Sequence, residues 1–372
     1  SRNLLLASEV ALSLVLLVGA GLLLRTLGRL HDIEPGYRTE NITRFVLSLP
    51  ESAYPELSHG SAFFETLEQR LSALPGVESV GSTFGMVLHN WGATGTAEIE
   101  GEPEPPPGEE ILAQIRPVTP TYLETMGIPV VRGRGIEPTD RQGAPEVGLV
   151  NETLARNLFG DEDPIGKRIQ VTVDFGYGSP FRTIVGVVRD TRNISLTREP
   201  YAAFYVPQRQ AGPSFLAVAV RTTPGAGPLI GAIREQVVAL DPNVPLRGVE
   251  TMDEVVAEAL APTRFFLTLL GVFAGLAVSL AAIGLYGVAT YMVSRRRQEI
   301  GIRMALGARG TRVTRMVVAQ AAAPTLLGVT AGLLTALAGV TVLESLLFEV
   351  EPRDPLVFVG VTAILIAVAF LA

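Results

Sequence analysis

The segment from Gly160 to Arg168, GDEDPIGKR, contains residue types that could bind a phosphate group. A phosphate-binding loop places four residues between its two glycines and a Ser or Thr after the Lys, where the hydroxyl holds Mg²⁺. Here five residues separate Gly160 from Gly166, and Arg168 follows Lys167. We therefore interpret the segment as a Pro-Gly turn that leads into a strand.

Residue types that hold metals or act as nucleophiles are few and scattered. The chain has no cysteine, which excludes disulfides, thiolate metal sites and Cys nucleophiles. Its three histidines, His31, His59 and His89, have no partner at the i,i+4 spacing, whereas a metal site needs convergent ligands. The sequence therefore predicts no catalytic site, no metal site and no cofactor, and we expect the protein not to be an enzyme.

A basic loop at residues 294–318 is the strongest local pattern. Against one acid, Glu299, it holds Arg295, Arg296, Arg297, Arg303, Arg309, Arg312 and Arg315. Glu299 and Arg303 can pair one helical turn apart, and Ile300 and Met304 form an apolar ridge beside the small residues Gly301 and Ala305. From periodicity alone, a simple juxtamembrane loop is the preferred interpretation.

Four apolar stretches surround this loop and the large polar segment before it. They are Leu4–Leu24, which carries only Glu9, Phe265–Val293, Ala319–Leu343 and Leu356–Ala372. A helix needs about 20 apolar residues to cross a bilayer, so we expect four transmembrane helices, the fourth completed in a longer parent protein. Because Lys and Arg gather in cytoplasmic loops, residues 294–318 should be cytoplasmic and the segment between the first two spans extracytoplasmic. That segment is net acidic, which argues against binding nucleic acid.

The predicted spans lack the ionisable groups that ion-coupled transporters keep near the middle of the membrane, but they carry stripes of small residues. Small residues at every fourth position let helices approach closely, and the spans contain Gly271, Gly275 and Ser279, and Gly328, Gly332 and Ala336. Packing within one bundle and dimerisation both fit this pattern. Phe265–Val293 would be about 43 Å long as a helix, against a membrane core of about 30 Å, so it either tilts or projects as a stalk.

The segment between the first two spans has the pattern of two βαβ-like units. Strand, helix and strand are predicted at Ile42–Leu49, Ser61–Leu74 and Val77–Thr83, and again at Phe215–Arg221, Pro228–Leu240 and Leu246–Val249. Two such units suggest a split α+β layer of ferredoxin-like type. Its parts would occupy residues 40–116 and 214–260, with residues 117–213 inserted as a subdomain with its own core. The proline-rich segment Gly101–Gly108 is expected to be a solvated loop.

Several segments resemble the FtsX-like permease family and the membrane part of MacB-type ABC transporters. The most specific is RRRQEIGIRMALGA at Arg295–Ala308, and others are PGY at Pro35–Tyr37, LPGVESV at Leu74–Val80, MGIPVVRGR at Met126–Arg134, VNETLARNLFGDEDPIGKRI at Val150–Ile169 and IVGVVRDTR at Ile184–Arg192. The resemblance covers essentially the full length. It is closest to duplicated permeases, of which this would be the second half.

The resemblance implies a domain plan. Residues 1–25 would be the first transmembrane helix, 26–262 a periplasmic MacB-like core domain with a porter-like layer and an inserted subdomain, and 263–372 an FtsX-like transmembrane domain with helices near 265–293, 319–343 and 356–372. The protein would then be a multi-pass protein of the bacterial inner membrane.

The resemblance also implies a function and partners. A cytoplasmic ABC ATPase would drive a dimer or pseudo-dimer of four-helix units surrounded by membrane lipid, and the movement would reach a periplasmic domain that handles an exported or envelope substrate. The ATPase-facing coupling element would comprise Arg297, Glu299, Ile300, Gly301, Arg303, Met304, Ala305, Leu306, Gly307 and Ala308. The alternative is a membrane scaffold or sensor whose periplasmic domain binds a partner without an ATPase.

Overall fold

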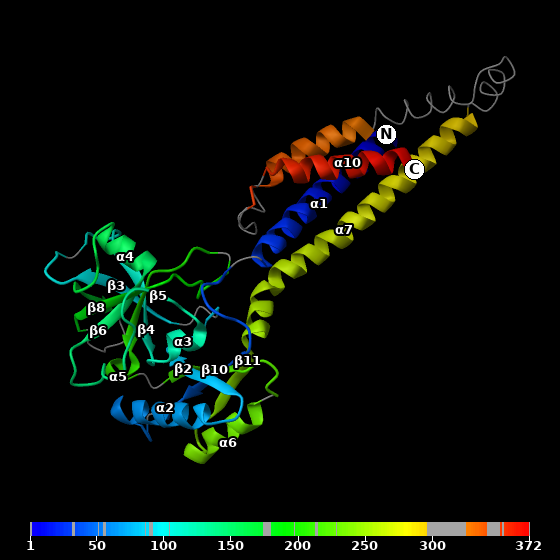
Figure 1. Cartoon of the computed structure of the whole chain (residues 1–372). Coiled ribbons are helices and arrows are strands. Elements are labelled where there is room, and N and C mark those ends of the chain that lie inside the picture. The colour runs from blue at the N-terminus through cyan, green and yellow to red at the C-terminus, as the bar shows by residue number, and fades with distance from the viewer. Residues whose placement is uncertain are drawn as a thin grey trace. The chain divides into compact units, whose positions relative to one another are not determined.

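The computed structural model describes residues 2–31, 34–50, 52–54, 57–85, 87–88, 92–103, 105–173, 180–196, 198–212, 215–227, 229–295, 325–340, 350–351 and 353–371. The chain divides into two compact units, which Figure 1 shows with their elements labelled. Glu34–Ala259 form an α+β unit, and Ser1–Ile33 together with Leu260–Ala372 form a helical unit.

One part of the α+β unit is a four-stranded layer with two helices. Its elements are β1 (Ile42–Ser48), α2 (Leu57–Ser72), β2 (Val77–Thr83), β10 (Phe215–Thr222), α6 (Ile230–Leu240) and β11 (Leu246–Thr251). The strands lie in the order β11-β1-β10-β2, and all these neighbours are antiparallel. Strands of the two βαβ units therefore alternate in the sheet, as in the predicted split layer. We call this part the split layer.

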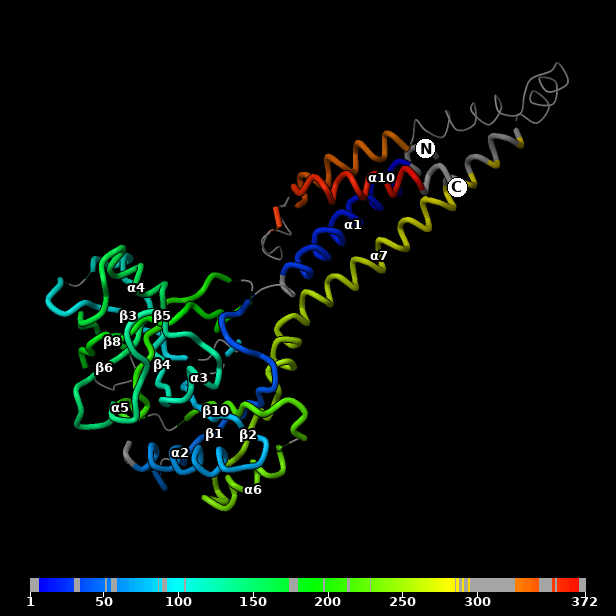
Figure 2. Tube along the Cα trace, viewed as in Figure 1, coloured from blue at the N-terminus to red at the C-terminus, as the bar shows by residue number. Residues whose placement is uncertain are grey.

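The split layer buries side chains on both faces of its sheet. On one face, where α2 and α6 lie side by side (Figure 1), Phe45 and Leu47 of β1 pack against Phe64 and Leu67 of α2, all completely buried. Alternate residues of the same strand, such as Ile42, belong to a second core on the other face. Figure 2 shows the short helix α3 (Tyr122–Met126) on that second side.

The other part of the α+β unit is a ring of strands. Its elements are β3 (Ala93–Ile99), β4 (Ile111–Val118), β5 (Val130–Gly133), β6 (Val147–Asn151), α4 (Glu152–Phe159), β7 (Arg168–Thr172), β8 (Arg182–Val188), β9 (Ala203–Pro207) and α5 (Gln208–Ala211). The order β4-β3-β7-β8-β6-β9 closes on itself because β4 also pairs with β9. The six strands thus form a small closed barrel, and β5 pairs with β8 outside the ring.

This ring shifts the expected boundary of the inserted subdomain. From the sequence we placed the insertion at residues 117–213, but β3 and most of β4 lie before Pro117 and pair within the barrel. Their alternation of apolar and polar residues predicts strands but carries no information about which strands they pair with. The barrel needs both strands to close, so the first βαβ unit of the split layer ends with β2 and the inserted barrel begins before β3.

The helical unit contains α1 (Arg2–His31), most of α7 (Met252–Arg295), a helix at Thr325–Val340 and α10 (Pro355–Leu371). Side chains of α1, including Leu14 and Leu22, are completely buried in a core shared with the other three helices. At one end of α1, Arg25 forms an ion pair with Asp354, which also accepts a hydrogen bond from the Leu356 N–H near the start of α10.

Two of these helices, at Ala7–Arg29 and Met252–Gly284, are long and apolar enough to cross a membrane. The helices at Thr325–Val340 and Pro355–Ala367 are apolar but shorter within the described residues. The four expected spans are therefore represented by two long and two shorter apolar helices, and a total of four crossings stays a prediction.

Both long helices extend beyond their predicted apolar cores. α1 continues to His31, past the expected end at residue 25, and α7 begins at Met252, well before Phe265. The added turns carry charged residues such as Arg29 and Glu258. Hydropathy marks only the part of a helix that suits lipid, so these polar turns were not included in the predicted spans.

Candidate functional site

The split layer and the barrel of the α+β unit meet beside an apolar core that contains residues of both parts. We call the contacts around β2, β4 and α5 the joint. Among the described residues, the strand pairing between the two parts is Thr83 of β2 with Val118 of β4, flanked by a hydrogen bond from the Phe84 N–H to the Pro117 carbonyl at 2.9 Å. Side chains on α2 add to this joint, because Gln208 donates to the Ser61 hydroxyl over 3.3 Å and Arg209 forms an ion pair with Glu65 at 2.5 Å. Both partners from the barrel belong to α5. The joint therefore combines backbone pairing with side-chain contacts.

Glu68 of α2 lies at the centre of this joint. Its carboxylate accepts a hydrogen bond from the Ser82 hydroxyl at 2.5 Å. Ser82 and Thr119 are linked twice, from the Ser82 N–H to the Thr119 hydroxyl at 2.8 Å and from the Thr119 N–H to the Ser82 carbonyl at 3.0 Å. Burial raises the pKa of Glu68 to about 7, although hydrogen bonds from Ser82 and Thr119 oppose the rise. A carboxyl group with a pKa of about 7 thus lies beside the contact between Ser82 and Thr119.

The first turns of α7 are rooted in the core behind this joint. Met252 and Val255 are each only 1% exposed and pack in the same apolar cluster as Tyr122 of α3. Glu250, which precedes the helix, pairs with the buried Arg44 at 2.9 Å. α7 continues as one helix from this core into the helical unit. The buried first turns are therefore the part of α7 that contacts the core of the α+β unit.

A reciprocal capping box begins α7. The Thr251 N–H donates to the Glu254 carboxylate at 2.8 Å, and the Glu254 N–H donates to the Thr251 hydroxyl at 3.2 Å. This spacing, Thr-x-x-Glu, is a known sign of a helix start. It was readable in the sequence, but our prediction began the helix at the first uncharged stretch.

Replacing Thr251 with alanine should destabilise the first turn of α7 by about 1 kcal/mol, because one helix N–H loses its partner. Amide hydrogen exchange of the full chain would show faster exchange at residues 253–255. Thr139→Ala, which removes an exposed threonine hydroxyl elsewhere in the unit, should leave that exchange unchanged. Equal exchange in wild type and Thr251→Ala would mean that packing of Met252 and Val255 alone fixes the helix start.

Two of the segments that carry the family resemblance contact each other. Gly36, with a positive φ of 82°, lies so close to the 190–192 segment that a Cβ there would meet the Asp190 carbonyl oxygen at 2.2 Å. The Arg192 N–H donates to the Pro35 carbonyl at 2.9 Å, and the Tyr37 hydroxyl donates to the Arg192 carbonyl at 3.5 Å. The PGY segment therefore needs its glycine for a close backbone approach.

Asp190 also organises the start of α4. Its carboxylate accepts from the Asn151 amide at 2.6 Å and from the Thr153 hydroxyl at 2.8 Å, while Asn151 caps the Leu154 N–H at 3.0 Å. The asparagine and the aspartate of two resembling segments thus form one buried network. Their role is structural, and sequence alone did not pair them.

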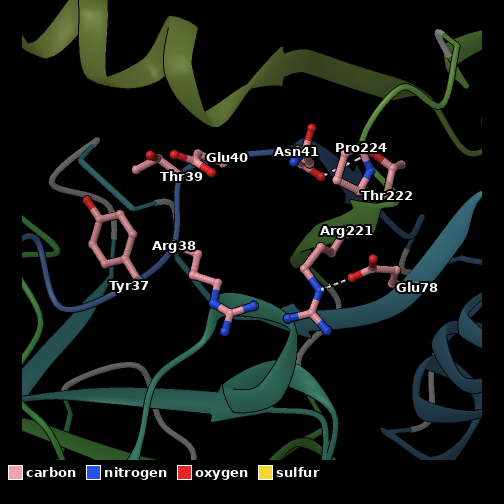
Figure 3. Close-up of a pocket in the computed structure, with 9 residues that line it drawn as sticks. All are labelled: Tyr37, Arg38, Thr39, Glu40, Asn41, Glu78, Arg221, Thr222 and Pro224. Carbon is pink, nitrogen blue, oxygen red and sulfur yellow. Dashed lines mark hydrogen bonds and ion pairs between the residues drawn. The ribbon is translucent and has the colours of Figure 1, made fainter.

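A cavity of about 480 Å³ lies where the segment after α1 meets the ends of β2 and β10. Its lining residues, drawn in Figure 3, are Tyr37, Arg38, Thr39, Glu40, Asn41, Glu78, Arg221, Thr222 and Pro224. Arg221 pairs with Glu78 at 3.0 Å and donates to the Glu124 carbonyl at 3.1 Å, at the end of α3. The Arg38 N–H donates to the Met126 carbonyl at 2.7 Å. These groups hold the end of α3, and the two arginines are balanced by Glu40 and Glu78.

The segment at Gly160–Arg168 forms a turn, as the sequence indicates. Gly166 has a positive φ of 86°, Lys167 pairs with Glu162, and β7 begins at Arg168. Within the part of the chain that the structure describes, no group of three or more His, Asp or Glu side chains could hold a metal ion.

The predicted coupling residues, Arg297 to Ala308, lie outside the described residues. Their role stays a prediction from the sequence.

The predicted stripe on the third apolar stretch faces α1. A Cβ at Gly328 would lie 2.7 Å from the Ala7 carbonyl oxygen, and a Cβ at Gly332 would lie 2.9 Å from the Ala11 Cα. Ala336 is 4% exposed in the same core. The two helices therefore approach closely along this stripe.

The predicted stripe on the second apolar stretch has different surroundings. Gly271, Gly275 and Ser279 are exposed, and a Cβ at either glycine would meet nothing within 4 Å among the described residues. Among the described side chains of this apolar stretch, the buried residues are instead Ala274, Ala277 and Ala281. Their i, i+3 and i+7 spacing is a helix-face pattern, and the sequence analysis did not single them out.

Two protein-family models match this chain, one over its first part and one over its last part. A family model described as the MacB-like periplasmic core domain matches residues 10–239, and one described as the FtsX-like permease C-terminal region matches residues 271–372. The periplasmic region of MacB from Actinobacillus actinomycetemcomitans matches with a TM-score of 0.41 and 14% identity, over 61% of this chain and 95% of that one.

Two curated relatives each match more than half of this chain. The pyoverdine export ATP-binding/permease protein PvdT of Pseudomonas syringae pv. tomato is 29% identical over 220 residues, 56% of this chain and 32% of that protein. The uncharacterized ABC transporter permease YknZ of Bacillus subtilis is 23% identical over 225 residues, 59% of this chain and 55% of that protein. The matches thus span about a third of one relative and about half of the other.

Proposed function

The chain belongs to the family of ABC-type permeases that combine a MacB-like periplasmic core domain with an FtsX-like permease domain, and from this premise we propose how it works. It is the permease part of a transporter in the bacterial inner membrane. It passes movement from a cytoplasmic ATPase to its α+β unit, which faces the periplasm and handles an exported or envelope substrate. One observation carries this proposal: a single helix, α7, starts in the core of the α+β unit and continues into the helical unit.

The length of α7 and the burial of its first turns support this transmission of movement. Its 44 residues correspond to about 66 Å at 1.5 Å per residue, about twice the thickness of a membrane core. The helix can therefore cross the membrane and still reach the domain. Met252 and Val255 fix its first turns in the core beside the joint, so a displacement of the helix moves that core as well.

Export is the direction that the relatives favour. PvdT is named as a pyoverdine export protein, and the predicted spans lack charged residues near mid-membrane. Such spans are poorly suited to pass a polar solute. We propose that the substrate is handled by the periplasmic unit and is not threaded through the helices.

The cytoplasmic partner is proposed to be an ABC ATPase that binds the segment Arg297–Ala308 within the loop at 294–318. The loop is rich in arginine, and the segment Arg297–Ala308 carries the resemblance to the signature of the permease family. The apolar ridge of Ile300 and Met304 would contact the ATPase, and the pair of Glu299 and Arg303 would stiffen the loop as a helix.

A second permease half or a second copy of the chain is the other proposed partner. The exposed stripe of Gly271, Gly275 and Ser279 supports it, since small residues at this spacing let membrane helices pack closely. In this arrangement the buried alanine face of α7 packs within the helical unit of its own chain. The exposed stripe of α7 packs against the second permease half.

The coupling role can be tested by replacing Glu299 and Gly301 together with alanine. We expect the full-length protein in lipid membranes to lose most of its stimulation of the partner ATPase, because the loop loses its ion pair and its small contact residue. The control is Arg309→Ala with Arg312→Ala, in the same loop but outside the proposed contact, which should keep the stimulation. Undiminished stimulation by the first variant would rule out this coupling element. Purification of the protein with an envelope partner and without any ATPase would rule out the transport proposal as a whole.

A further inference from the structure

A buried arginine in the α+β unit lacks a counter-charge. Arg116 of β4 is 2% exposed. One guanidinium nitrogen, Nη1, is 3.4 Å from the side-chain oxygen of Gln114, which is a long hydrogen bond, and Nε has no partner. Among the residues that the structure describes, no carboxylate forms an ion pair with Arg116.

A second buried arginine of this unit does have an acidic partner. Arg44 of β1 is 4% exposed, pairs with Glu250 at 2.9 Å and donates to the Val87 carbonyl at 2.7 Å. A buried charge without a partner is strongly unfavourable, and a negative group bound beside Arg116 would offset this cost.

The side chains beside Arg116 add hydrogen-bond donors. Tyr205 of β9 is its partner in the strand register and lies on the neighbouring strand. The Tyr205 hydroxyl is 3.2 Å from the Thr191 hydroxyl, which accepts from the Asn193 amide at 2.6 Å. If the Thr191 hydrogen points to Tyr205, the phenol hydrogen of Tyr205 is left to donate elsewhere. Two donors, the Arg116 guanidinium and this phenol, then lie on adjacent strands.

Arg116 and Arg44 both act electrostatically on two buried tyrosines. Burial raises the pKa of Tyr37 and of Tyr122, while the charges of Arg116 and Arg44 lower both values. Both arginines therefore lie within electrostatic reach of the same two phenols. Glu250 pairs with Arg44, whereas no described carboxylate forms an ion pair with Arg116.

We propose that Arg116 and Tyr205 form a binding site for one small monovalent anion, chloride or a short carboxylate such as acetate. The anion accepts hydrogen bonds from the guanidinium and the phenol, and neutralises the buried charge. The burial of Arg116 excludes nucleotides and lipid headgroups, which are too large to enter. This site is independent of the proposed transport function, since it requires no ATPase.

The test uses the full-length protein in detergent and measures the broadening of the ³⁵Cl NMR signal of chloride. We expect excess broadening that saturates with chloride concentration, that is lost in Arg116→Gln and that is partly kept in Arg116→Lys. Arg141→Gln, which removes an exposed arginine in the same unit, should behave as wild type. Acetate added at constant ionic strength distinguishes the two anions: displacement of the broadening shows that the site takes carboxylates, and no displacement restricts it to chloride.

A stability measurement keeps the proposal testable if Arg116→Gln does not fold. Wild type should melt at a higher temperature in chloride than in gluconate of equal ionic strength, because an anion that binds the folded state stabilises it. Arg116→Lys should show a smaller rise. Wild type with neither saturable broadening nor a higher Tm would overturn the proposal, as would equal broadening in wild type and Arg116→Gln.

Discussion

Replacing Gly328 with leucine should separate the helix at Thr325–Val340 from α1. A Cβ at this position would lie 2.7 Å from both the Ala7 carbonyl oxygen and the Val10 Cβ. Backbone atoms of α1 cannot move aside as a flexible side chain can, so the two helices must part. We expect a loss of about 3 kcal/mol of packing free energy, at the upper end of the range for overpacked cores. Hydrogen exchange of the full chain in lipid should show α1 exchanging faster around Val10 and Leu14.

The same substitution at Gly271 is the matched control. Both positions are glycines in apolar helices, but a Cβ at Gly271 meets nothing within 4 Å among the described residues. Gly271→Leu should therefore leave hydrogen exchange of the helical unit unchanged. If both variants were equally well packed, or equally disrupted, the assignment of the Gly328 stripe to α1 would be wrong.

Gly271→Leu also addresses the proposed contact with a second permease half. If the exposed stripe packs against another chain, leucine should reduce association of the full-length protein, seen as a loss of cross-linked dimer, without any change inside the chain. Dimer yield equal to wild type would place the contact on another surface.

These two stripes show what the sequence could and could not predict about the helices. The spacing of Gly328 and Gly332 is the same as that of Gly271 and Gly275, so both stripes were found. Which one faces α1 depends on how the helices are rotated, and a local pattern does not contain that rotation. The alanine face at Ala274 was overlooked for a related reason, because alanine is common in all apolar helices.

In the α+β unit, too, local features could be predicted from the sequence and distant contacts could not. The strand at Val77–Thr83 was predicted with the bounds that the structure has, because alternation and the Pro-Gly stop are local signals. The closing pair of β4 and β9 joins residues near 115 to residues near 205, and no local signal predicts such a partner. The sequence also did not predict that Arg116 is buried and that Glu68 is half-buried. Glu68 lies on an amphipathic helix and Arg116 in an alternating strand, where such residues usually face solvent.

Glu68 leads to the second large effect, a loss of stability as the pH rises. Its pKa is raised from 4.5 to about 7 in the folded protein, so the folded state holds a proton that the unfolded state has released. The contribution is favourable below pH 4.5 and is lost as the pH rises to about 7. A shift of this size corresponds to about 3 kcal/mol, which is an upper limit because the side chain is only half-buried.

Glu68→Gln removes this dependence because an amide stays neutral at every pH. It can still accept the hydrogen bond from Ser82. We expect equal stability of variant and wild type near pH 4.5 and a more stable variant at pH 8, measured by urea unfolding of the full chain with hydrogen exchange at β2 as the local probe. The charged neighbours Glu65 and Arg209 pair with each other and are unchanged in both proteins, so the difference isolates Glu68. Glu235→Gln, at an exposed position of α6, should follow wild type at both pH values. A difference between wild type and Glu68→Gln that does not change with pH would show that folding does not raise the pKa of Glu68.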